Sequence, residues 1–119
     1  MRSVGLVLLL AACTARSATV DPLAGRVAGE PQNCITTTRN TTPTIVDGGT
    51  ILYREGRRIW RTAAVDACPA LRPETILIVE SFGSQVCRND IFRVLEPGRS
   101  IPSAPCRFDR FTPFEAPAR

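Results

Sequence analysis

The chain has 119 residues with 15 Arg, no Lys, no His and 11 acidic residues, so its formal charge is +4. This length allows one domain, and the composition is that of a globular protein rather than a disordered one. The missing His and Lys exclude Ser-His-Asp and Cys-His catalysis, His-ligated metals, Schiff-base lysines and lysine-containing phosphate loops.

The N-terminus has the pattern of a secretory signal. Residues 1–3 carry one positive charge, and residues 4–12 form an apolar run. As a helix this run spans about 14 Å, too short to cross roughly 30 Å of bilayer hydrocarbon, and it fits the apolar region of a signal peptide. The run ends in Leu10-Ala11-Ala12-Cys13, which resembles the lipobox of bacterial lipoproteins. We therefore expect cleavage after residue 12 and acylation of Cys13, the alternative being ordinary secretion with cleavage after Ala15.

The predicted lipid determines where in the cell we expect the protein to be located. By resemblance to other lipoproteins, Thr14 directly after the acylated cysteine predicts the outer membrane, facing the periplasm; without the lipid the protein would be periplasmic. Several acyl chains on one residue hold a protein firmly in a membrane. Residues 13–33 lack a helix or strand period and predict a flexible tether, the alternative being a segment that docks on the domain.

Residues 34–114 contain short apolar runs broken by turn residues, which predict strands. A strand at 44–46 and a turn at 47–49 precede a β-hairpin, whose strands 50–54 and 58–65 flank a Gly-containing loop. The later predicted elements are a Pro-rich loop at 67–73, a central strand at 75–80, a second hairpin of 85–87 and 91–95, a loop at 97–105, a last strand at 106–111 and a helical turn at 112–115.

These elements predict an all-β fold. We expect a small barrel or sandwich of about five to seven short strands, a short C-terminal helical turn and a tail at 115–119. An ordered region of about 80 residues has a small core and usually needs covalent cross-links.

Four cysteines provide such cross-links. The four are Cys34, Cys68, Cys87 and Cys106. Their even number and the absence of a Cys-x-x-Cys pair favour two disulfides over zinc or redox chemistry. We therefore expect no cofactor. Three connectivities are open. We favour Cys68–Cys87, joining the Pro-rich loop to the second hairpin, and Cys34–Cys106, joining the first and last strands.

Several motifs follow one another in a familiar order: Cys34-Ile35, Ile51-Leu52-Tyr53-Arg54, Arg58-Ile59-Trp60-Arg61, Cys68-Pro69-Ala70-Leu71, Gly83-Ser84-x-Val86-Cys87 and Cys106-x-Phe108. In these motifs the chain resembles a domain-of-unknown-function family of small four-cysteine proteobacterial envelope proteins and lipoproteins. It departs from the family at Asn89-Asp90, where Gly-Asp is common. The resemblance implies the fold and a location in the cell envelope. It assigns no catalytic residue.

The densest charge predicts a binding surface. Arg54, Arg57, Arg58 and Arg61 lie around one hairpin turn with Glu55 as the local acid, and could contact an envelope protein or an anionic envelope glycan. The alternative is a solvated hairpin whose arginines discourage edge-to-edge aggregation. After cleavage the charge falls to +3, and Tyr53 and Trp60 are typical core residues, which argues against nucleic-acid binding.

The acidic residues do not predict an enzyme. Asp47, Asp66, Asp90 and Asp109 all lie in turn-like sequence, where Asp caps backbone groups. We therefore expect a non-catalytic structural or interaction module of the cell envelope. The alternative is an inhibitor of an envelope-directed hydrolase such as lysozyme, which would insert loop 81–84 or loop 98–103 into the enzyme's cleft.

Overall fold

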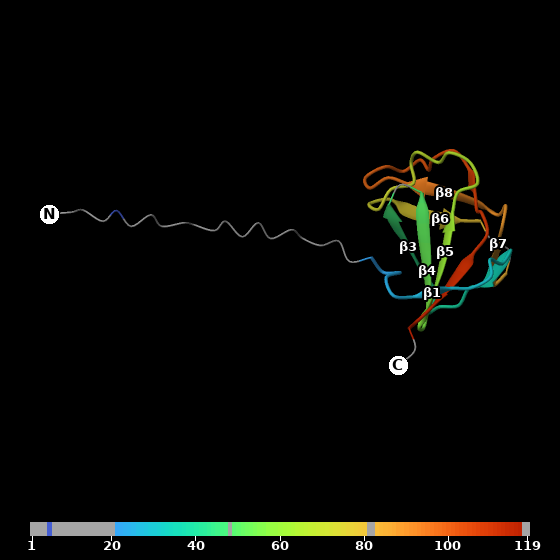
Figure 1. Cartoon of the computed structure of the whole chain (residues 1–119). Helices are drawn as coiled ribbons and strands as arrows, with labels where there is room; N and C mark the ends of the chain where they lie inside the picture. The colour runs from blue at the N-terminus through green and yellow to red at the C-terminus, as the bar shows by residue number, and fades with distance from the viewer. Residues whose placement is uncertain (1–4, 6–20, 48, 81–82, 118–119) are drawn as a thin grey trace.

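The computed structural model describes Gly5 and residues 21–47, 49–80 and 83–117 (Figure 1). Ten short strands and no helix lie within these ranges, which confirms the all-β prediction. No helix able to cross a membrane occurs in these same residues. The strands are β1 Val27–Ala28, β2 Cys34–Thr36, β3 Thr42–Asp47, β4 Thr50–Glu55, β5 Arg58–Ala63, β6 Ile76–Val79, β7 Gln85–Cys87, β8 Ile91–Leu95, β9 Cys106–Arg107 and β10 Thr112–Glu115.

The strands form three antiparallel sheets arranged as a sandwich. The largest has the order β1-β10-β5-β4-β3, a second has the order β6-β8-β9, and β2 pairs with β7. Single bridges between Ala64 and Phe108 and between Gln32 and Phe111 join neighbouring sheets. Figure 1 shows β6 and β8 running crosswise to β4 and β5, as expected when two twisted sheets pack face to face.

An aromatic cluster fills the space between the sheets. Tyr53 on β4 packs against Phe108 and Phe111, with ring centroids 6.4 and 6.2 Å apart, and Phe108 lies 4.5 Å from Phe92 on β8. All four rings are buried. Each ring contributes roughly 1.5–3 kcal/mol through burial, so these four rings are a substantial part of the hydrophobic core.

The β4–β5 hairpin forms as the sequence predicts. Glu55 lies opposite Arg58, so the turn contains only Gly56 and Arg57. Gly56 has a φ of 58°, a left-handed conformation that glycine adopts without steric cost.

Both disulfides form, but the favoured connectivity is wrong. Cys34 is bonded to Cys87 and Cys68 to Cys106. The second predicted hairpin is also absent: β7 pairs with β2 and β8 pairs with β6 and β9, although the chain does turn through Asn89. The two errors have one cause. Once β7 pairs with β2, Cys34 and Cys87 lie directly opposite each other, with Cα atoms 3.9 Å apart.

The two ends of the domain also differ from the prediction. Residues 112–115 form a strand, β10, between β1 and β5 rather than a helical turn. Pro113 is tolerated because it lies just past the end of β1, where its carbonyl accepts a hydrogen bond from Gly29. The flexible tether predicted at 13–33 is too long, because β1 pairs with β10 from residue 27 onward and Gln32 also forms a bridge to the domain. Arg26 in addition donates a hydrogen bond to the carbonyl of Arg57 in the hairpin turn.

Candidate binding site

The four predicted arginines do not share one face of the hairpin, because successive strand residues point to opposite faces. Directly paired residues share a sheet face, so Arg54 lies in one row with Ile59 and Phe114, and Arg61 lies in the next row with Leu52 and Thr112. We call this the outer face; the opposite face carries Tyr53 and Trp60. Arg58 alternates onto the Trp60 side, and Arg57 is in the turn.

Arg58 is engaged within the domain. Its Nε donates to Oε1 of Glu115, and its guanidinium carbon lies 5.4 Å from the centroid of the Trp60 ring. The indole N–H of Trp60 donates to Glu55 at 3.0 Å. These contacts hold Arg58 against the core residue Trp60 and the last strand.

Arg61 is held in place on the outer face and has no acidic partner among the described residues. Its guanidinium carbon lies 4.9 Å from the centroid of the Phe114 ring, a cation–π contact that fixes the side chain without neutralising its charge. Arg61 also lines a cleft of about 320 Å³ together with Arg110, which the sequence analysis did not single out. We call this hollow the arginine cleft; its lining residues are Pro31, Thr50, Arg61, Thr62, Ala63, Asp109, Arg110 and Thr112.

The acidic group in the arginine cleft already has other partners. Oδ1 of Asp109 accepts a hydrogen bond from the backbone N–H of Arg110 at 2.7 Å and lies 3.8 Å from Nε of Arg88. No ion pair joins it to the guanidinium of Arg61 or Arg110 within the described ranges. Two exposed arginines therefore line a cleft whose one acidic residue, Asp109, has its ion pair with Arg88 instead. This arrangement suits an oxyanion.

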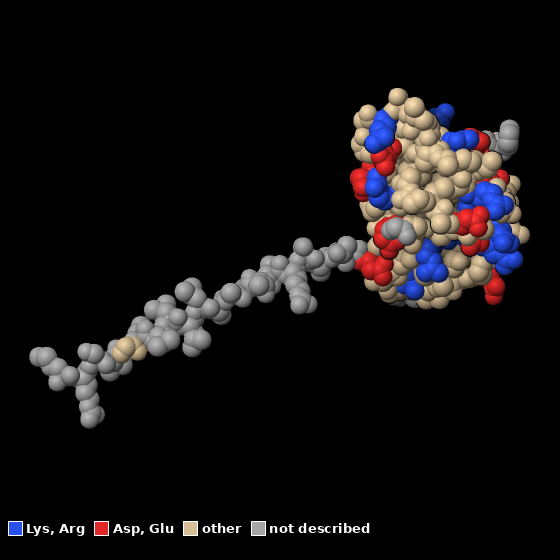
Figure 2. Space-filling view, turned by 90° about the horizontal axis from the view of Figure 1, so that it is seen from above, with Lys and Arg blue, Asp and Glu red and all other residues tan. Residues whose placement is uncertain are grey.

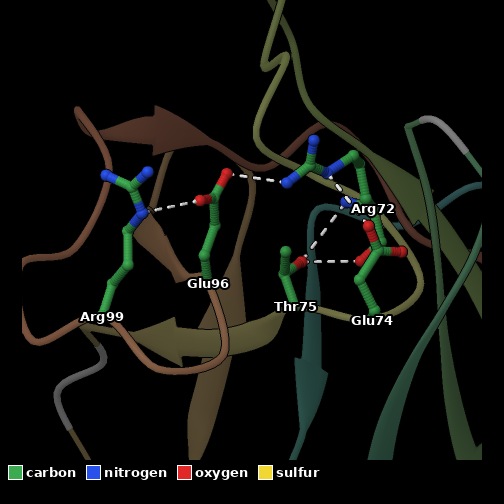
Figure 3. Close-up of polar contacts among 5 residues, drawn as sticks. All are labelled: Arg72, Glu74, Thr75, Glu96 and Arg99. Atoms are coloured by element: carbon green, nitrogen blue, oxygen red, sulfur yellow. Dashed lines mark hydrogen bonds and ion pairs between the residues drawn. The ribbon is translucent and has the colours of Figure 1, made fainter.

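Elsewhere six arginines form ion pairs with acids, whereas Arg26, Arg39, Arg54 and Arg57 form none in the described residues. Figure 2 shows basic and acidic side chains next to each other at several places on the viewed face. The best example is a chain of ion pairs in which Glu96 joins Arg72, at 2.7 Å, to Arg99, at 3.1 Å (Figure 3). Glu74 adds a contact to Arg72 at 3.3 Å. Arg61 and Arg110 thus share the lack of an ion pair with other arginines, and what distinguishes them is that they line one cleft together.

The ion pairs of Glu96 also support a protruding loop. Ile101 in the loop after β8 has 82 % of its surface exposed, which is unusual for a large apolar side chain. Ser103 holds the loop to β8: its backbone N–H donates to the carbonyl of Val94, and its hydroxyl accepts from the Val94 N–H. The other candidate loop, 81–84, lies partly outside the described residues.

The hollow beside Cys68 offers little catalytic chemistry. It has a volume of about 580 Å³ and a lining of mainly small residues around Cys68. Its two charged residues, Asp66 and Arg72, are paired with Arg107 and Glu96. In the described part of the chain, no three Cys, Asp or Glu side chains come together as a metal site would require.

Sequence comparison adds no further assignment. No family model, no curated protein sequence and no solved structure matches the chain. The predicted lipid-bearing residue, Cys13, lies outside the described residues. Arg110 and Thr112 could have been found from the sequence only if residues 112–115 had been assigned to a strand beside β5, because that pairing brings them to Arg61.

Proposed function

We propose that the chain is a cell-envelope lipoprotein, anchored through Cys13 in the outer membrane and facing the periplasm, that acts as a non-catalytic binding module. Its arginine cleft binds phosphate or carboxylate groups of the envelope, such as those of lipopolysaccharide or of peptidoglycan stems. The observation that carries this proposal is the pair of exposed arginines, Arg61 and Arg110, that line one cleft and have no ion-pair partner in the described residues.

The cysteine count supports the anchor. The sequence has five cysteines, and the other four are paired with each other. Cys13 is left over, directly after Leu10-Ala11-Ala12, where acylation gives an odd cysteine a chemical role. The two disulfides agree with an oxidising compartment.

Binding of oxyanions is tested with two variants of equal charge. The full chain carrying Cys13→Ser is mixed with lipopolysaccharide micelles, as a source of phosphate, and separately with peptidoglycan sacculi, as a source of carboxylate. The double substitution Arg61→Gln with Arg110→Gln removes two charges from the cleft. The control, Arg72→Gln with Arg99→Gln, removes two charges that are paired with Glu96.

We expect the cleft variant to bind at least one of the two materials about 30-fold more weakly, because each arginine at an anionic surface contributes about 1 kcal/mol. The control should bind nearly as well as the unmodified chain. Equal losses in both variants would mean that only net charge matters and would refute the cleft. The material on which the two variants differ identifies the source of the oxyanion.

A second candidate function is inhibition of an envelope-directed hydrolase such as lysozyme. It is favoured by Ile101, which stands exposed on a loop held at its base by Ser103 and the Glu96 ion pairs (Figure 3). An inhibitor of this kind inserts such a side chain into a substrate cleft. Loss of lysozyme inhibition on Ile101→Asp would support this function, and no inhibition by the unmodified chain at micromolar concentration would exclude it.

A further inference from the structure

The β6 strand has an open edge without the usual protection. Ile76–Val79 contains four uncharged residues, and in the described residues β6 pairs only with β8. Its free edge borders a hollow of about 410 Å³ that separates it from β3, and Ile76 is 54 % exposed. Exposed edge strands commonly carry charges, prolines or bulges that prevent pairing with another chain. The sequence predicted a central strand here, because the run is apolar throughout.

The hydrogen bonds of β8 show which groups of β6 face outward. Both backbone groups of Val94 bond to Ser103, on the side of β8 away from β6. Val94 lies opposite Leu77, so this is a pair without mutual hydrogen bonds, and the backbone groups of Leu77 also point away from β8. Because hydrogen-bonded and non-hydrogen-bonded pairs alternate along the strand, the backbone groups of Val79 also point away from β8. The free edge therefore presents the N–H and C=O groups of Leu77 and Val79.

We propose that this edge pairs with the same edge of a second copy of the chain. In the antiparallel register centred on Ile78, Leu77 of each copy lies opposite Val79 of the other, and each such pair exchanges two hydrogen bonds. Ile78 then faces Ile78 of the second copy across the twofold axis. Ile76 lies diagonal to that pair, so its exposed side chain becomes a neighbour of Ile78 of the second copy.

Charge and edge composition favour a second copy. The register places Glu80 opposite Ile76 of the other copy, and Glu80 is already paired with Arg93 at 3.3 Å, so no like charges meet. Among the other edge strands, β1, β2, β7 and β9 have only two or three residues each, and β3 is protected by Pro43, Asp47 and a register shift before Asp47. A contact of four residues buries much less than the roughly 1,200–2,000 Å² of a stable interface, so we expect a weak, reversible dimer.

Cysteine cross-linking tests the register. Ile78→Cys and Ile76→Cys are each placed in the full chain carrying Cys13→Ser, so that the introduced thiol is the one cysteine outside the two disulfides. In the proposed register the two residues at position 78 have Cα atoms about 4.5 Å apart, within disulfide range. The two residues at position 76 are about 14 Å apart, which is too far.

We expect mild oxidation to convert Ile78→Cys to a covalent dimer at least tenfold faster than Ile76→Cys. Equal rates, or no dimer from either variant, would overturn the proposal. A second measurement needs no cysteine: Ile78→Lys should abolish the dimer seen by sedimentation at high protein concentration, while Ile101→Lys, with the same charge outside the edge, should keep it. A strictly monomeric unmodified chain at about millimolar concentration would also overturn it. The arginine cleft plays no part in either test.

Discussion

Replacing Tyr53 by Phe should stabilise the protein, although Tyr53 is a buried core residue. Its side chain is 3 % exposed, and its ring packs against Phe108 and Phe111. The hydroxyl oxygen has no hydrogen-bond partner among the described residues. Phenylalanine keeps the ring and its contacts and removes only this unsatisfied group.

The expected gain follows from the cost of the buried hydroxyl. An unsatisfied buried polar group destabilises the folded state by about 1–3 kcal/mol, so Tyr53→Phe should raise the free energy of unfolding by at least about 1 kcal/mol. For a domain of this size each kcal/mol corresponds to a Tm change of about 4–8 °C. Thr62→Val is the matched control. The buried Thr62 hydroxyl donates to the carbonyl of Asp109 at 3.0 Å, so its removal should lower stability by about 1 kcal/mol.

The same residue predicts a pH dependence. Burial raises the pKa of the Tyr53 hydroxyl, because the charged phenolate would lose its hydration. In the unfolded chain this group ionises near pH 10, whereas the folded chain keeps it protonated. The ionisation of Tyr53 therefore has no effect on stability below pH 10 and should lower the free energy of unfolding by about 1.4 kcal/mol per pH unit above it. The chain has no lysine and no other tyrosine, so the ionisation of Tyr53 is the one side-chain titration that should change stability just above pH 10.

Urea unfolding of the full chain carrying Cys13→Ser, followed by the fluorescence of its single tryptophan, measures both effects. Trp60 is buried and reports on the core. At pH 7 the Tyr53→Phe variant should be the more stable, and the difference should widen between pH 10 and pH 11. A variant that is less stable at pH 7 would refute the unsatisfied hydroxyl. Parallel curves above pH 10 would refute the raised pKa.

Other expectations follow from the covalent framework and the hairpin turn. Cys68→Ala should leave Cys106 reactive toward a thiol reagent, as identified by peptide mapping, and reaction at Cys87 instead would contradict the pairing. Replacing both Cys34 and Cys87 by Ala should cost about 4 kcal/mol in a urea titration, from the entropy of the loop they close. Gly56→Ala should cost about 1–2 kcal/mol, because φ is 58° there; an unchanged Tm would contradict that turn conformation.

The features that could be predicted from the sequence are those that depend on local residue chemistry or on a count of residues. The β4–β5 hairpin follows from two β-prone runs around Gly56, and two disulfides follow from an even cysteine count in a small domain. The positions of Arg58 and Arg61 on opposite faces follow from strand alternation. Each of these features depends on residues close together in the chain or on a simple count.

The strand partners and the cleft were not predictable in this way. Short strands such as β7 and β10 have almost no preference of their own, and their partners are set by the packing of the whole core. Pro113 resembles the first position of a helix until β1 is known to end beside it. Arg110 reaches Arg61 only through that pairing, so the site became visible only in three dimensions.

The anchored, disulfide-linked module is tested most directly by the intact mass of the protein from its native membrane fraction, before and after reduction and alkylation. We predict a chain that begins at Cys13, carries the mass of its acyl groups, and shows four alkylated cysteines only after reduction. An unmodified chain, or thiols that react without reduction, would contradict both the envelope anchor and the covalent framework of the fold.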